Sequence, residues 1–165
     1  MFSKSPKSEP ASAEQQALLA IVREHMPGAD EDSVRIVTAI AGLLAGVAYA
    51  DRELSPAEAA RIRSELERVH WLDQRGVETI CDALRAHVVH HATTLAPRYT
   101  RELRELADRE LRLEVLDVLV DIAAADGKIT HDEVSTLRRT ATALGLSQDD
   151  YNRVQARHKD KLSFL

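Results

Sequence analysis

Two related stretches decide the fold: Ala48-Tyr49-Ala50-Asp51-Arg52-Glu53-Leu54-Ser55-Pro56-Ala57-Glu58, and 75 positions later Ala123-Ala124-Ala125-Asp126-Gly127-Lys128-Ile129-Thr130-His131-Asp132-Glu133. Each is a small-residue helix end followed by an aspartate, a short turn, an aliphatic residue and Ser/Thr-x-x-Glu. The last element is the pattern of a capping box, in which a hydroxyl and a glutamate satisfy the free N–H groups of a new helix. The sequence therefore predicts two copies of a helix–acidic turn–helix unit.

The composition favours helices throughout. The 165 residues are 44% hydrophobic and 30% charged, as in a globular protein, while aromatic residues make up only 4%. Apolar residues recur with a helical period, and no period-2 strand is evident. We predict a single-domain, all-α bundle of about seven to eight helices with an internal pseudo-twofold duplication. Its expected limits are residues 13–160, after a disordered N-terminal tail over residues 1–12.

The helices are expected at positions set by caps and breakers. Ser55 and Thr130 are predicted N-caps, Pro56 occupies the first helical position, and Gly127 is predicted to take a left-handed conformation. The expected ranges are about 12–26, 32–50, 56 onward, 73–91, a short helix after Pro97, 106–125, 131–145 and 147–158. The segment 106–125 is apolar on most sides, which predicts that it is the central buried helix.

Charge and hydropathy exclude some classes of function. The net charge is −5, with −5 concentrated in residues 101–133 and +3 in residues 134–165. An acidic middle argues against nucleic-acid binding. No apolar run is long enough to span a bilayer, and the first ten residues lack the apolar region of a signal peptide. A single cysteine, Cys81, allows no internal disulfide, so we expect a cytoplasmic location.

The acidic turns share part of their sequence pattern with EF-hand calcium loops. Gly127 to Glu133 fits the second half of an EF-hand loop, but the first and third ligand positions fall on Ile122 and Ala124, which have no carboxylate. Neither turn can be a complete EF-hand. If the fold brings the turns together, they could form one oxygen-rich site for a divalent cation. The candidate ligands are Asp51, Glu53, Glu58, Asp126 and Glu133.

The alternative for these turns is helix capping alone, because aspartate and Ser/Thr-x-x-Glu are also what helix ends require. The sequence leaves both interpretations open. A further row of acids shares one face of the apolar helix. It is either the solvated edge of that helix or part of an acidic pocket near Asp126, and we interpret it as a solvated edge. It consists of Glu110, Glu114, Asp117 and Asp121.

The duplicated Ala-rich helix end, Asp-Gly turn and Ser/Thr-x-x-Glu resemble the tellurite-resistance TerB-like family. The resemblance covers about residues 30–158 and is clearest over 124–133; the copy over 50–58 departs from it at Arg52, which replaces the glycine. It implies a non-catalytic bacterial stress-response protein. It also implies a divalent cation (Ca, Mg or Mn) at the acidic positions already named. Membrane-bound protein partners, and a peripheral place at the inner face of the membrane, are implied as well.

Other constellations carry weaker predictions. His87 and His91, with His90 between them, could hold zinc on one helix face, or could simply be surface histidines. The sequence His131-Asp132 is similar to the His-Asp pair of metal phosphohydrolases of the HD type. A metal-dependent hydrolase would require histidine and carboxylate side chains to converge in one cleft. Cys81 lies in an amphipathic stripe without an adjacent base, so we interpret it as a small buried hydrophobe. A purely structural helical adaptor is the remaining alternative.

Overall fold

The computed structural model describes residues 13–48, 55–69, 72–87, 95–125 and 127–158, and these residues form an all-α bundle. The predicted fold class is confirmed, and the described ranges contain no β-strand. The helices are α1 (Ala13–His25), α2 (Glu31–Ala48), α3 (Pro56–Glu67), α4 (Gln74–Ala86), α6 (Ala96–Leu106), α7 (Arg109–Ala123), α8 (His131–Ala143) and α9 (Gln148–Ala156). The predicted tail over residues 1–12 lies outside the described residues.

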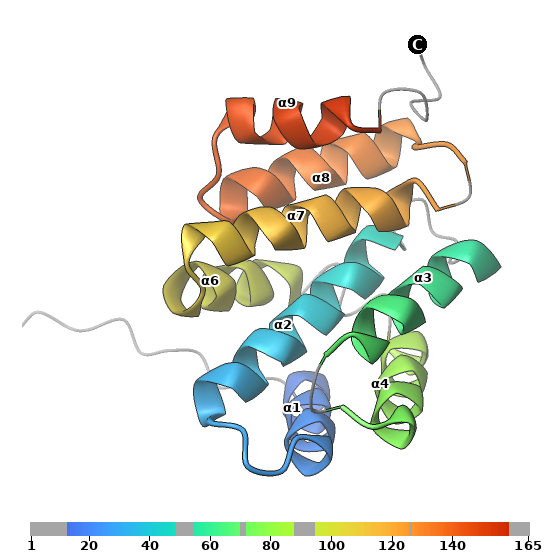
Figure 1. Cartoon of the computed structure of the whole chain (residues 1–165), viewed down its shortest axis with the longest axis vertical. Helices are drawn as coiled ribbons and strands as arrows, with labels where there is room; N and C mark the ends of the chain where they lie inside the picture. Colours follow the sequence, from blue (N-terminus) through green and yellow to red (C-terminus); the bar gives the residue numbers. More distant parts are fainter. Residues whose placement is uncertain (1–12, 49–54, 70–71, 88–94, 126, 159–165) are drawn as a thin grey trace, which may run out of the picture.

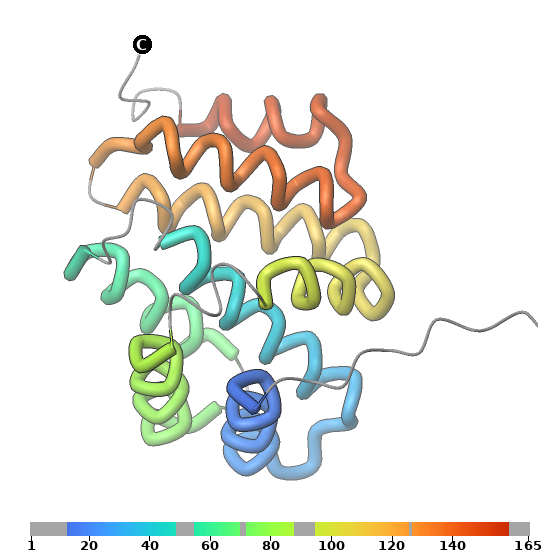
Figure 2. The backbone as a smooth tube through the Cα atoms, turned by 180° about the vertical axis from the view of Figure 1, so that it is seen from behind, coloured from blue at the N-terminus to red at the C-terminus, as the bar shows by residue number. Residues whose placement is uncertain are grey.

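The helices form two groups joined through α2. Helices α7, α8 and α9 lie side by side at one end of the molecule, and each contacts the other two (Figure 1). Helices α1 and α4 lie next to each other at the opposite end, with α3 beside α4 (Figure 2). Helix α2 crosses between the groups and contacts α1, α3, α4, α6, α7 and α8.

Helix α2 is therefore the central helix, and the prediction that the apolar helix α7 holds this place was wrong. Small residues explain the difference, since Ala39, Ala41, Gly42 and Ala45 leave room for neighbouring helices to approach α2 closely. Helix α7 buries Leu116 and other aliphatic residues but keeps its acidic edge in solvent. Apolar content alone did not identify the helix that other helices surround.

Helix boundaries follow the predicted caps. The side chains of Ser55, Thr130 and Ser147 each accept a hydrogen bond from the N–H of the third helical residue, and Asp73 and Asp108 cap α4 and α7 in the same way. Gly127 has a φ of 94°, in the left-handed region that glycine tolerates best, as predicted. Both halves thus show a capped helix after the acidic turn, and the pseudo-twofold duplication itself stays a prediction.

Leu106 was expected to begin the apolar helix, and the structure instead makes it the last residue of α6. Ala107 has extended backbone, with φ −103° and ψ 141°, and Asp108 then caps α7. The Asp108 carboxylate accepts a hydrogen bond from the Leu111 N–H at 2.8 Å, and this N-cap starts the new helix. The helical pattern continued across this break, so periodicity alone could not locate it.

Candidate cation site at the acidic turns

Two of the five predicted ligands, Glu58 and Glu133, lie among the described residues. Both are 1% exposed, although glutamate is rarely buried to this extent in proteins. Each is the third residue of a helix that follows an acidic turn, Glu58 in α3 and Glu133 in α8. Asp51, Glu53 and Asp126 lie outside the described residues, so their predicted convergence stays a prediction.

Glu133 takes part in a complete capping box. The Thr130 hydroxyl accepts from the Glu133 N–H at 3.2 Å, and Glu133 Oε1 accepts from the Thr130 N–H at 3.2 Å. The same carboxylate oxygen accepts from the Thr130 hydroxyl at 3.0 Å. The capping interpretation is therefore correct for this residue. These bonds engage Oε1 of the Glu133 carboxylate.

Glu58 lies in the first turn of α3, in the position that corresponds to Glu133 in α8. Ser55 adopts an extended conformation, with φ −66° and ψ 153°, and its hydroxyl accepts from the Glu58 N–H at 3.1 Å. Pro56 follows at the first helical position, where a missing N–H costs nothing. The burial of Glu58 beside this cap places a carboxylate in the interior at the start of α3.

A cavity of about 350 Å³ lies between the start of α3 and the end of α7. Its α3 wall includes Ala57 and Arg61, and the opposite wall is formed by Asp121 of α7 with Ala124 and Ala125, which directly follow α7. Arg61 and Asp121 form an ion pair across it. Since Ala57 follows the first acidic turn and Ala125 precedes Asp126, the described flanks of the two turns border one cavity.

The acidic row on α7 is a solvated edge at Glu110 and Glu114, as predicted, whereas Asp121 lines the cavity between α3 and α7. Glu110 and Glu114 are exposed, and Asp117 and Asp121 are half-buried. Asp117 forms an ion pair at 3.2 Å with Arg157, the residue that directly follows α9, so this edge also contacts the end of α9. Such partly exposed pairs contribute little stability each, of the order of 0–1 kcal/mol.

Among the residues the structure describes, no group of three or more His, Cys, Asp or Glu side chains is close enough to hold a metal ion. His131 and Asp132 are both exposed in the first turn of α8. His87 is exposed at the end of α4, while His90 and His91 lie outside the described ranges. The hydrolase alternative therefore has no converged cleft within the described part of the chain.

Cys81, which was predicted to be a small buried hydrophobe, packs against the core but is only partly buried. It is half-buried and lines a second pocket, between α3 and α4, together with Arg63 and Arg85. Burial raises the pKa of its thiol, and the nearby Arg63 acts in the opposite direction. Sequence reasoning missed this pocket, because Arg63 and Arg85 meet only when two separate helices pack.

The sequence model of the family described as Tellurite resistance protein TerB matches residues 37–156. The chain belongs to the TerB family. The match begins within α2 and ends at the last residue of α9, so it includes both acidic turns of this TerB-family protein and both buried glutamates. Neither a curated protein nor a solved structure matches the chain. In the described part of the protein, no helix is long and apolar enough to cross a membrane.

Proposed function

We propose that this TerB-family protein is a non-catalytic stress-response protein whose two acidic turns together bind one divalent cation. The ligands would come from Asp51, Glu53, Glu58, Asp126 and Glu133. The single observation that carries the proposal is the burial of Glu58 and Glu133, at matching positions after the two turns. Burial of a carboxylate is costly unless another group compensates its charge, and a bound cation is one such group.

The chemistry of the donor set fits a hard cation. All five candidate ligands are carboxylates, which Ca²⁺, Mg²⁺ and Mn²⁺ prefer, and none is a histidine or cysteine. The described flanks of both turns also border one cavity, which neither Glu58 nor Glu133 lines. When bound, the cation would neutralise the acids and hold the ends of α2 and α7 to the starts of α3 and α8. A cation-dependent rigid surface would then be available to a protein partner, for which we propose a membrane-associated component.

Calorimetric titration of the full chain with Ca²⁺, Mg²⁺ and Mn²⁺ tests the proposal. We expect saturable binding of at least one cation, together with a rise in the melting temperature, since a ligand that binds only the folded state stabilises it. The Asp51→Asn, Asp126→Asn double variant should lose both effects. Asp132→Asn, which removes an exposed acid beside Glu133, is the matched control and should retain them. No binding by the native protein would rule out the cation role.

The complete capping box of Thr130 and Glu133 favours a second candidate, a helical adaptor whose acids only cap helices. Here the native protein would bind no cation. The double variant would keep the Ser55 and Thr130 caps and should therefore change the free energy of unfolding little, while partner binding would persist. The cation titration therefore separates the two candidates.

A further inference from the structure

The pocket between α3 and α4 reaches the start of α3 at Pro56, but its chemistry differs from that of the acidic turns. It measures about 330 Å³, at the lower end of small-molecule sites. Its walls are apolar, with Ala45 of α2, Ala59 and Ile62 of α3 and Leu84 of α4 among them. The only charged residues that line it within the described ranges are two arginines, Arg63 and Arg85, and both are positive.

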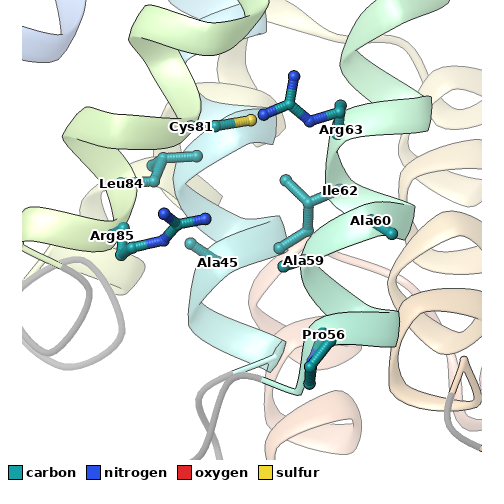
Figure 3. A pocket seen from close by; sticks show the side chains of 9 residues that line it. All are labelled: Ala45, Pro56, Ala59, Ala60, Ile62, Arg63, Cys81, Leu84 and Arg85. Carbon is teal, nitrogen blue, oxygen red and sulfur yellow. The ribbon is translucent and has the colours of Figure 1, made fainter.

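The two arginines reach into the pocket from opposite helices. Figure 3 shows Arg63 extending from α3 toward Cys81 and Arg85 extending from α4 toward Ala45, with Ile62 and Leu84 between them. Arg63 is partly compensated by Glu78, at 3.6 Å. Arg85 is exposed and, within the described residues, forms no ion pair. A positive group at the edge of an apolar hollow matches an amphiphile with an anionic head.

We propose that this pocket binds a medium-chain fatty carboxylate, with the carboxylate on Arg85 and the chain between Ile62 and Leu84. The volume of the pocket limits the length of the alkyl chain. A water-sized group occupies roughly 30 Å³ of liquid, so the pocket holds about eleven non-hydrogen atoms, which corresponds to a chain of eight to ten carbons. The guanidinium fork suits a carboxylate, to which it can donate two parallel hydrogen bonds.

Binding of decanoate to the full chain, measured by calorimetry below its micellar concentration, tests this assignment. We expect saturable binding to the native protein, and about tenfold weaker binding to Arg85→Gln, because a charge-assisted hydrogen bond is lost. Arg75→Gln removes an exposed arginine from the same helix outside the pocket and should bind as the native protein does. Ala59→Phe, which fills the pocket, should abolish binding. Melting curves confirm that each variant is folded.

Cys81 provides an independent reporter because it is the only cysteine of the chain. Decanoate should slow its reaction with an aromatic disulfide reagent severalfold at a fixed pH, and should not do so in Ala59→Phe. Decanol and decyltrimethylammonium test the head group, and both should bind at least tenfold more weakly than decanoate.

Three results would overturn the assignment: no binding by the native protein, equal binding to Arg85→Gln, or equal binding of the uncharged and cationic analogues. Tighter binding of decyl phosphate than of decanoate would overturn the choice of a carboxylate. None of these outcomes depends on the cation proposal, which concerns other residues.

Discussion

The ring of Tyr99 in α6 lies directly against Gly42 in α2. A Cβ atom added at position 42 would lie 2.6 Å from Tyr99 Cδ2 and 2.7 Å from Tyr99 Cζ, closer than real side-chain atoms approach one another. Tyr99 is fully buried, so its ring has no solvent to move into. Position 42 is thus a glycine because α6 packs on the central helix at this point.

We predict that Gly42→Ala destabilises the protein. In an exposed helix this change would stabilise by roughly 0.5–1 kcal/mol, because glycine loses more backbone entropy than alanine. Here the clash with the Tyr99 ring should outweigh that gain, since overpacking a core costs about 1–3 kcal/mol. The expected net loss is about 1–2 kcal/mol in the free energy of unfolding, measured by urea denaturation.

A double-variant cycle supplies the control. In a Tyr99→Leu background the ring is absent, so Gly42→Ala should cost much less than in the native background. Equal costs in both backgrounds would show that the Tyr99 ring is not what constrains position 42.

We predict that Thr130→Ala lowers the free energy of unfolding by about 1 kcal/mol. The variant loses the hydroxyl that caps the Glu133 N–H, and with it the hydrogen bond from that hydroxyl to the carboxylate. Ser135→Ala, at an exposed position of the same helix, is the matched control and should change stability by less than about 0.5 kcal/mol. Equal effects would contradict a special role for the Thr130 cap.

The caps and the helix class could be predicted from the sequence because both depend on residues near one another in the chain. Thr130 and Glu133 are three positions apart, and their hydrogen bonds need no distant partner. The central position of α2 and the contact of Gly42 with Tyr99 depend instead on which helices pack together. The same holds for the pocket with Arg63 and Arg85, which no local pattern indicates.

The predicted cation ligands depend partly on local sequence and partly on how the helices pack. The positions of Glu58 and Glu133 after the turns follow from local spacing, but their burial at 1% exposure depends on the surrounding helices. The sequence pattern therefore identified the candidate residues without indicating how deeply two of them are buried.

We predict that the stabilising effect of Asp150 depends on pH. The Ser147 N–H donates to its carboxylate at 2.9 Å, and this bond, with smaller effects of the Ser147 hydroxyl and Arg109, lowers the pKa of Asp150. A lowered folded-state pKa stabilises the protein above the unfolded pKa, near 4, and the effect is lost as the pH falls through the folded pKa. Asp150→Asn should therefore lower the melting temperature at pH 7, and the difference should shrink toward pH 3.

The neighbouring Asp149 gives the comparison for this titration. It is exposed on the same turn of α9, so Asp149→Asn should change the melting temperature less than Asp150→Asn at pH 7. A difference between native and Asp150→Asn that stays constant from pH 7 to pH 3 would exclude ionisation of Asp150 as its cause.

We predict that Arg61→Gln strengthens divalent-cation binding at the acidic turns. Arg61 lines the cavity between α3 and α7 and pairs there with Asp121, so its guanidinium offsets negative charge beside the proposed site. Its removal should lower the dissociation constant roughly three- to tenfold at low ionic strength, and less in high salt, which screens partly exposed charges. Arg63→Gln removes the same charge from the same helix but faces the other pocket, so it should have a smaller effect. If the two variants bind the cation equally, the cation does not bind near the α3–α7 cavity.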